Sequence, residues 1–329
     1  MEAGDSAFVT GGSGFIGGRL IGRLTREGVK VRALARSDSS AAKVEALGAE
    51  PVRGDLDDED AMRVGAEGCK YAFHAAAKVE DWGDPADFER LNVEGTNRAL
   101  RATKAAGVER FVHVGTEAAL FAGDPLINAD ESAPLRPDSK SLYPATKAKA
   151  ERAVRSASAD GFETVVVRPR FVWGPGDTTV LPAIVDMVKA GKFRFIGGGH
   201  HRTSTTHVDN TVEGLVLAAD RGRPGAAYFV TDGEPIEFQE WIKKLVATRG
   251  VEVPDKSVPK PVAGALAAGS ETVWKLLRKT DSPPPLTRMA YWVSALECTL
   301  DDSAARNEMG YVPVITREQG LTDLAEQPR

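Results

Sequence analysis

The chain of 329 residues is long enough for one large domain or two smaller ones, and its 42% hydrophobic and 27% charged residues are typical of globular proteins. Its 42 basic and 47 acidic residues give a net charge of -5 and form no long run of one sign, which argues against nucleic acid as a partner. Two cysteines, Cys69 and Cys298, exclude a disulfide framework and lack the spacing of a zinc or iron–sulfur site, so we expect a cytoplasmic protein.

Neither the N-terminal residues nor the most apolar stretch of the chain indicates a membrane-spanning protein. Residues 1–6 are polar and acidic and lack the basic and apolar pattern of a secretory leader. The most membrane-like stretch, residues 261–277, is interrupted by glycine, serine and glutamate and is too short to span a bilayer. Contact with a bilayer surface is the alternative that this stretch leaves open.

Short apolar runs alternate with longer helical patterns through the first half of the chain, as in a parallel sheet covered by helices on both faces. The predicted strands are residues 7–10, 29–35, 50–53, 71–74, 110–114 and 163–167. The clearest helical patterns are residues 87–106 and 144–158, and another follows the first strand at residues 15–26. The sequence therefore predicts an α/β fold with a doubly wound parallel sheet of the Rossmann type.

After Pro169 the chain is richer in proline and glycine clusters, which mark turns and loops. A later helical pattern at 208–219 and a strand-like run at 227–231 are expected to return to the first sheet. We therefore predict a dinucleotide-binding domain over residues 1–170 that residues 205–232 complete. Residues 171–204 and 233–329 are predicted to form a smaller, interleaved substrate-binding domain.

A glycine-rich turn follows the first predicted strand and opens the first predicted helix. The turn reads Thr10-Gly11-Gly12-Ser13-Gly14-Phe15-Ile16-Gly17, with GxxGxxG spacing. Small residues let the backbone approach a pyrophosphate, and the helix N-terminus directs free N–H groups and partial positive charge at it. We therefore expect cofactor contacts from Gly11, Ser13, Gly14, Phe15, Ile16 and Gly17.

The end of the second predicted strand carries Arg36 where an NAD site usually has an acidic residue for the ribose hydroxyl. A planar guanidinium suits a 2'-phosphate, and Ser37 is a further possible donor, so NADP is favoured over NAD. The alternative is that Arg36 is a solvated surface residue. Further cofactor contacts are expected at later strand ends, although ordinary structural roles would also explain them, from Asp55, Leu56, Ala75, Ala76 and Ala77.

Tyr143 and Lys147 are four residues apart in a predicted helix, which places a phenol and an ammonium on one face. A lysine cation and a positive nicotinamide both favour the phenolate, which suits the tyrosine to acid or base catalysis. Thr116 follows the fifth predicted strand and offers a second hydrogen bond to a substrate oxygen. In isolation, the tyrosine and lysine would be interpreted as a surface pair.

Together these features resemble the extended short-chain dehydrogenase/reductase superfamily. The motifs that carry the resemblance are the turn at residues 10–17, Leu91-Asn92-Val93-Glu94-Gly95-Thr96, Thr116, Tyr143 to Lys147, Arg168-Pro169, Val172-Trp173-Gly174-Pro175-Gly176 and His207-Val208-Asp209-Asn210. Closer signals, His74-Ala75-Ala76-Ala77-Lys78 with Trp82-Gly83, Thr231-Asp232-Gly233-Glu234-Pro235 and Gly310-Tyr311-Val312-Pro313, resemble the 3β-hydroxysteroid dehydrogenase family, including bacterial reductases of 2-alkyl-3-ketoalkanoic acids.

The resemblance implies hydride transfer between NADP(H) and a secondary alcohol or ketone of an apolar substrate. It makes Tyr143 the general acid in reduction, Lys147 the residue that orients the nicotinamide ribose and lowers the tyrosine pKa, and Thr116 the residue that aligns the carbonyl. Asn92 is a candidate proton relay or, alternatively, a buried amide that ties a helix to a strand. The resemblance also adds further cofactor contacts: Lys78, Pro169 and Val172.

Val79, Trp82 and Trp173 are candidate walls of an apolar substrate pocket, with core packing as the alternative for each. The resemblance implies a homodimer through the helices at 87–106 and 144–158, although both apolar faces would equally suit contacts within one chain. The five histidines lack metal-ligand spacing, so no metal is predicted. Sterol, β-keto acid and terpenoid alcohol are not separated by the sequence.

Two other functions fit the same fold. A nucleotide-sugar epimerase or dehydratase is suggested by Thr116-Glu117, but Ala118 follows where a further acidic residue is expected, and Arg36 argues against tightly held NAD. A non-catalytic NADP-binding sensor is the second alternative. Such relatives typically lack the tyrosine and lysine that this chain has.

Overall fold

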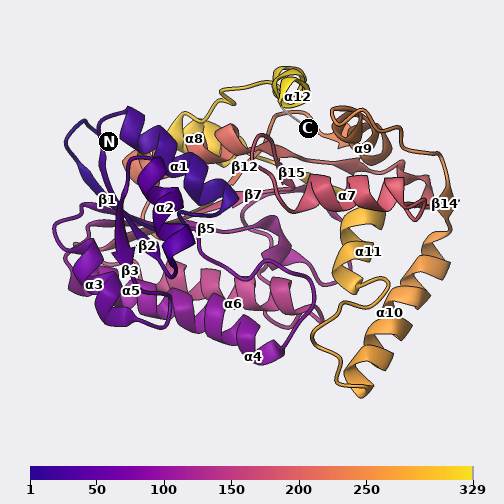
Figure 1. The fold of residues 1–329 in the computed structure, drawn as a ribbon, viewed down its shortest axis with the longest axis horizontal. Coiled ribbons are helices and arrows are strands. Elements are labelled where there is room, and N and C mark those ends of the chain that lie inside the picture. The colour runs from indigo at the N-terminus through magenta and orange to yellow at the C-terminus, as the bar shows by residue number, and fades with distance from the viewer. Residues whose placement is uncertain (328–329) are drawn as a thin grey trace.

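Seven parallel strands form the central sheet in the computed structural model, which describes residues 1–327 (Figure 1). The strands are β1 (Ser6–Thr10), β2 (Lys30–Ala35), β3 (Glu50–Arg53), β4 (Tyr71–His74), β5 (Arg110–Val114), β7 (Glu163–Pro169) and β12 (Ala227–Val230). Their order is β12-β7-β5-β4-β1-β2-β3, and every neighbouring pair is parallel. This confirms the doubly wound sheet that the alternating pattern predicted.

Helices cover both faces of this sheet (Figure 1). One face packs against α1 (Phe15–Arg26), α2 (Asp38–Ala46) and α8 (Val208–Arg221), and the other against α3 (Glu59–Ala66), α5 (Gly95–Ala105) and α6 (Leu142–Ser156). Strand β1 shows why. Ala7 and Val9 enter the first of these cores and Phe8 the second, so the strand is apolar at consecutive positions.

The chain returns to the sheet after leaving it. Strand β12 pairs with β7 through Ala227 to Val166 and Phe229 to Arg168, and α8 packs beside it. The segment that was expected to return thus extends the first sheet. Residues between β7 and α8 lie outside this sheet, so the two parts of the molecule are interleaved in sequence.

The second part contains shorter elements and an aromatic core that includes Trp173, Phe238 and Trp241. Its helices are α7 (Val180–Lys189), α9 (Phe238–Ala247), α10 (Lys260–Leu276), α11 (Arg288–Ala295) and α12 (Arg317–Glu326). Its strands, with β6 (Leu126–Ala129), are β8 (Val172–Trp173), β9 (Phe195–Ile196), β10 (Arg202–Thr203), β11 (Thr206–His207), β13 (Ile236–Glu237), β14 (Ser257–Val258) and β15 (Cys298–Leu300). They form a four-stranded sheet, β13-β10-β15-β6, and two strand pairs, β11-β8 and β14-β9.

Two predicted helices differ from the observed ones. The pattern at 87–106 is divided into α4 (Pro85–Phe88), a π-helical turn (Glu89–Glu94) and α5. Such turns insert a residue into the α-helical ladder and often occur at functional sites. Helix α6 begins at Leu142, before Pro144, because a proline in the first turn removes an N–H that has no helical acceptor. This start places Tyr143 inside the helix.

None of the helices within residues 1–327 is both long enough and apolar enough to cross a bilayer.

Candidate active site

The glycine-rich turn lies where the strand order reverses, between β1 and β4, which is the usual ligand site of such sheets. Gly11 has φ +73°, and a Cβ there would lie 2.6 Å from the backbone of Ala75. A Cβ on Gly17 would lie 2.2 Å from the carbonyl oxygen of Gly11. Both positions therefore require glycine. A Cβ on Gly11 would push the turn away from the loop after β4, and a Cβ on Gly17 would push the start of α1 away from the turn.

The start of α1 is open to an anion. Gly14 is its N-cap and provides no side-chain cap, and the first turn contains no acidic residue. The unpaired N–H groups and the helix dipole at this end attract negative charge. Ser13 and Gly14 are exposed here, and Phe15 and Ile16 are half-buried. The cradle thus fits a pyrophosphate group.

Other predicted cofactor residues follow strands β3 and β4. Ala75, Ala76 and Ala77 follow β4 and are half-buried. Asp55 is exposed and accepts a hydrogen bond from the backbone N–H of Asp57 at 2.8 Å. Leu56 is buried in the core between the sheet and α3, so its side chain packs inside the protein.

Arg36 is exposed at the end of β2. Ser37 caps α2 by accepting from the backbone N–H of Ser40 at 3.2 Å, so its hydroxyl already has a structural role. Arg53, which the sequence reasoning missed, ends β3 opposite Ala35 and forms an ion pair with Asp38. Arg36 and Arg53 therefore lie at the ends of neighbouring strands. Their proximity could not be predicted without knowing that β2 and β3 are adjacent in the sheet.

Thr116 and Tyr143 meet beside a buried carboxylate. Thr116 follows β5, donates its hydroxyl to Glu117 at 2.8 Å and accepts from the N–H of Ala118 at 3.1 Å. Burial and the Glu117 carboxylate raise the pKa of Tyr143, while its hydrogen bond with Thr116 opposes this increase. Tyr143 consequently stays protonated at neutral pH.

Lys147 is buried one helical turn after Tyr143, and its Nζ lies 3.0 Å from His113 Nε2 and 2.8 Å from the Val114 carbonyl oxygen. Burial lowers the pKa of Lys147 to about 8, although the Glu151 carboxylate raises it. The ammonium contacts β5, and Lys147 is not among the groups that raise or lower the pKa of Tyr143 here, so the lowering by the lysine stays a prediction.

His113 is a neighbour of the site that sequence reasoning missed. Burial, followed by Lys147 and His74, holds its pKa well below the usual value, so it is a neutral acceptor for the lysine. Its ring stacks on that of His74 at 5.3 Å, and its Nδ1 has no hydrogen-bond partner within residues 1–327. The only sequence feature that could have indicated this role is the presence of a histidine within the otherwise apolar part of strand β5.

Two buried ion pairs support this edge of the sheet. Arg168 at the end of β7 pairs with Glu151 of α6, and both side chains are fully buried. Arg170 pairs with Glu117 and also contacts the Thr203 hydroxyl. The first pair ties α6 to the sheet, and the second fixes the carboxylate that accepts the Thr116 hydroxyl. Within residues 1–327, no group of three or more His, Cys, Asp or Glu side chains is arranged to hold a metal ion.

A family model for the 3-beta hydroxysteroid dehydrogenase/isomerase family matches residues 8–260. The chain belongs to this family. It is 44% identical over 319 residues to a 4-hydroxy-2-methyl-3-oxo-4-farnesyl-3,4-dihydroquinoline-1-oxide ketoreductase of Stigmatella aurantiaca, covering 97% of this chain and 95% of that protein. It is 35% identical to a 2-alkyl-3-oxoalkanoate reductase of Stenotrophomonas maltophilia, covering 96% and 97%.

Solved structures agree on the fold. The dTDP-glucose 4,6-dehydratase DesIV of Streptomyces venezuelae has a TM-score of 0.73 at 24% identity, covering 97% of this chain and 95% of that one. The UDP-glucose 4-epimerase of Thermotoga maritima has a TM-score of 0.75 at 20% identity, covering 98% and 97%. The family and the named reductases confirm the prediction of an oxidoreductase that acts on hydroxyl or keto groups.

In this dehydrogenase family member, Asn92 is a structural clamp. Its Oδ1 accepts from the Lys78 N–H at 2.7 Å, and its Nδ2 donates to the Lys78 carbonyl at 3.0 Å and to the Thr146 hydroxyl at 3.1 Å. These contacts tie the loop after β4 to the π-helical turn and α6. They correspond to the tying role, and the proton-relay role stays a prediction.

Trp173 was predicted as a pocket wall, but it lies in the core. It is 1% exposed, its Nε1 donates to Asp232 at 2.7 Å, and its ring packs edge-on against Trp241 and His207 at 4.8 Å. The alternative of core packing therefore holds for Trp173. Sequence alone did not separate these roles because a pocket wall and a core position are equally apolar.

The remaining predicted residues lie at the same end of the sheet. Val79 is 57% exposed, and Trp82 donates its indole N–H to the Lys279 carbonyl at 2.9 Å. The Lys78 ammonium lies 3.3 Å from a Glu80 carboxylate oxygen. Pro169 ends β7 and Val172 begins β8. Val79 and Trp82 thus lie in the loop that follows β4 and the three alanines after it.

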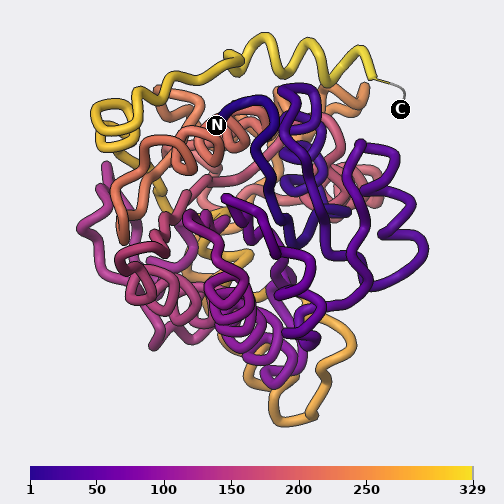
Figure 2. Tube along the Cα trace, turned by 90° about the vertical axis from the view of Figure 1, so that its left-hand side faces the viewer, coloured from indigo at the N-terminus to yellow at the C-terminus, as the bar shows by residue number. Residues whose placement is uncertain are grey.

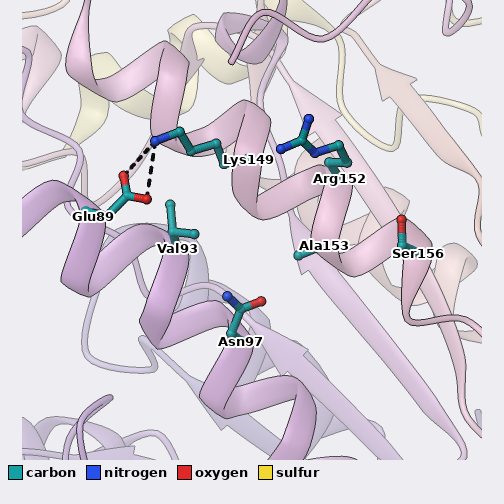
Figure 3. Close-up of a pocket in the computed structure, with 7 residues that line it drawn as sticks. All are labelled: Glu89, Val93, Asn97, Lys149, Arg152, Ala153 and Ser156. Atoms are coloured by element: carbon teal, nitrogen blue, oxygen red, sulfur yellow. Dashed lines mark hydrogen bonds and ion pairs between the residues drawn. The ribbon is translucent and has the colours of Figure 1, made fainter. Parts of the chain in front are cut away.

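A shallow groove lies elsewhere on the protein, between the π-helical turn, α5 and α6 (Figure 3). Its lining is mostly polar and consists of Glu89, Val93, Asn97, Lys149, Arg152, Ala153 and Ser156. Lys149 pairs with Glu89 across it at 3.0 Å. Lys149 is two residues after Lys147, hence on the far side of α6 from the catalytic face. The groove is separate from the candidate active site.

Proposed function

We propose that this protein transfers a hydride between NADP(H) and a carbonyl or secondary hydroxyl of an apolar substrate, with reduction of a β-keto acid or similar ketone as the favoured reaction. The observation that carries the proposal is the convergence of Thr116, Tyr143 and Lys147 beside the glycine cradle at one edge of the sheet. The names of the reductase relatives support a ketone as the substrate.

In reduction, Thr116 and Tyr143 hold the substrate oxygen, and Tyr143 donates a proton to it as negative charge develops. The raised pKa of Tyr143 supports this direction, because the phenol enters the reaction protonated. Lys147, one helical turn from Tyr143, is proposed to supply positive charge that stabilises the phenolate once the proton has left. The bound nicotinamide supplies or receives the hydride.

The cofactor preference rests on the two arginines. Gly11, Gly14 and Gly17 are proposed to admit the pyrophosphate, and Arg36 with Arg53 to bind a 2'-phosphate in place of the ribose hydroxyl. A solved dehydratase of this fold was crystallised with NAD, so the fold by itself does not exclude NAD. The distinction therefore depends on Arg36 and Arg53 rather than on the sheet.

The predicted division of the chain into a cofactor-binding part and a substrate-binding part is included in this proposal. Residues 1–170 with 205–232 are proposed to hold the cofactor, and residues 171–204 and 233–329 to hold the substrate, with Val79 and Trp82 at its entrance. A cytoplasmic location and a homodimer stay predictions. The dehydratase alternative is not proposed, because Glu117 is already engaged by Arg170 and Thr116.

Cofactor titration tests the proposal first. NADPH and NADH are titrated into the wild type and into Arg36→Ala and Arg53→Ala, with Arg223→Ala as a control whose side chain is 68% exposed. We expect Arg36→Ala to weaken NADPH binding by about tenfold or more and to leave NADH unchanged, because a charge-assisted contact is lost. Equal or tighter NADH binding by the wild type would refute the NADP assignment.

Turnover tests the chemistry. NADPH oxidation is followed with a 2-alkyl-3-ketoalkanoate as the probe substrate, using the wild type and Tyr143→Phe. Loss of a general acid lowers rates by about 10²–10⁴-fold. A Tyr143→Phe variant that binds NADPH but retains the wild-type rate would exclude the proposed role of Tyr143.

A further inference from the structure

Helix α10 has an apolar face directed away from the protein. Val262, Leu266, Val273, Leu276 and Leu277 are between 46% and 78% exposed. Their spacing places them within one stripe along an α-helix about 25 Å long and its C-cap residue, Leu277. The opposite face packs on the body of the protein and contains the buried residues Ala263, Ala267 and Glu271. The stripe is therefore outward-facing in a helix whose other side is already packed.

The position of α10 makes this face accessible. The helix lies at the edge of the molecule in Figure 1, and in Figure 2 the same orange segment forms the lowest projection of the chain. Isolated exposed leucines are ordinary on protein surfaces, whereas a continuous apolar stripe is a mark of an interaction site.

The exposed charges within residues 260–279 are of one sign. Residues 260–279 contain four basic residues and one acidic residue, whereas the whole chain has a net charge of -5. The acidic residue, Glu271, is buried and paired with Arg288. Within residues 1–327, salt bridges are absent for Lys260, Arg278 and Lys279, so these exposed cations remain available.

Aromatic side chains accompany the cations at the C-terminal end of α10. The Lys279 ammonium lies 5.1 Å from the centre of the Trp274 ring, and the Lys275 ammonium lies 6.0 Å from that of Trp82. Tryptophan and lysine together are typical of the boundary between lipid headgroups and acyl chains.

We propose that α10 docks this enzyme on an anionic lipid bilayer, with the stripe entering the acyl boundary and the flanking cations meeting lipid phosphates. An amphipathic helix with these two features binds at a membrane surface without spanning it. A second copy of the chain fits less well, because face-to-face packing of two stripes would bring the cations of both copies together.

Docking here would also orient the entrance of the proposed active site. Trp82, in the loop that follows the alanines of β4, donates to the Lys279 carbonyl just after α10. In the same loop, Asp81 accepts from the Thr287 hydroxyl before α11. Two hydrogen bonds thus couple the loop to both ends of the segment that follows the helix. An apolar substrate dissolved in the bilayer would reach this loop without crossing water.

Vesicle sedimentation tests the proposal with the full chain and without cofactor or substrate, so its outcome is independent of the proposed hydride transfer. Vesicles of phosphatidylcholine alone are compared with vesicles that also contain phosphatidylglycerol. We expect binding to the anionic vesicles that decreases with added salt. The double variant Leu266→Glu/Leu276→Glu should bind about tenfold more weakly or worse, because two buried leucines are lost from the contact.

Val314→Glu is the matched control, since Val314 is 53% exposed but lies in the segment before α12. It should bind vesicles like the wild type. Thermal unfolding of each variant separates lost docking from lost folding. Absence of binding to both vesicle types would overturn the proposal, as would a concentration-dependent dimer that the double variant abolishes while vesicle binding is absent.

Discussion

Around Tyr143 the protein buries charged side chains and pairs them, whereas along α10 it leaves apolar side chains in solvent. Arg168, Glu151 and Lys147 lie in the interior at the sheet edge, and Leu266 and Leu276 lie on the surface. A globular protein usually does the opposite in both places. We attribute the buried charges to the proposed catalysis and the exposed apolar stripe to the proposed docking.

The buried pair beneath α6 should show the largest effect on stability. Arg168→Leu leaves the Glu151 carboxylate buried without its main partner, which is expected to cost about 3–5 kcal/mol in the free energy of unfolding. The double variant Arg168→Leu/Glu151→Leu should recover most of this loss. Urea unfolding measures both, with the exposed Arg152→Leu on the same helix as a control. Equal losses in the single and double variants would contradict the pairing argument.

The second effect is a loss of stability in acid. His74 is fully buried between the Thr10 and Thr96 hydroxyls, and burial lowers its pKa to about 3. Unfolding lets the ring take up a proton below its ordinary pKa of about 6.5. The stabilisation is therefore complete above pH 6.5 and decreases as pH falls toward 3, by about 3 kcal/mol at pH 4.

Urea unfolding of the wild type and His74→Gln at pH 7 and pH 4 measures this contribution, because glutamine does not titrate. The difference between the two pH values should be smaller in the variant, whatever its stability at pH 7. His200→Gln is the control, since that side chain is 68% exposed. An identical pH dependence in wild type and His74→Gln would exclude His74 as the cause.

The third effect concerns the pH profile of turnover. Lys147 has a pKa of about 8 and donates to His113, while His74 and Glu151 are the other titratable groups that face this pair. We expect kcat/KM for reduction to decrease above pH 8, as the ammonium loses its proton. His113→Phe removes an acceptor from the ammonium, so its pKa should fall further, by about one unit.

The alkaline limb of the profile should therefore move to lower pH in His113→Phe and return toward the wild-type position in His113→Gln, which keeps an acceptor. A purely structural role for His113 would change the rate without moving the limb. In that case the contact with Lys147 has no part in tuning the lysine.

The smallest effect is expected at the α10 stripe. Leu266→Glu and Leu276→Glu should each change the free energy of unfolding by less than about 0.5 kcal/mol, because exposed side chains contribute little to the packed core. Urea unfolding without lipid measures this. A loss of several kcal/mol would mean that the stripe packs against the protein, and the comparison between the two regions would fail.

The parallel sheet was predictable because its strands carry local signals. Strands buried on both faces are apolar at consecutive positions, so Phe8 and Val9 both report burial although they enter different cores. The glycine turn was equally predictable from the sequence, because Gly11 and Gly17 occupy positions where any Cβ would contact backbone atoms. Tyr143 and Lys147 were predicted from their helical spacing together with their position after the fifth strand of a chain that opens with the glycine turn, and neither observation needs tertiary information.

The sequence by itself thus determined the fold class and supplied the proposed cofactor cradle and the proposed catalytic pair, since these patterns depend on residues within about one or two helical turns of one another. Only the tertiary structure decided which partners these residues have: His113 for Lys147, Arg170 for Glu117, and the core for Trp173. It also decided which face of α10 is outward. Those outcomes depend on contacts between segments far apart in the chain, and local patterns carry no information about them.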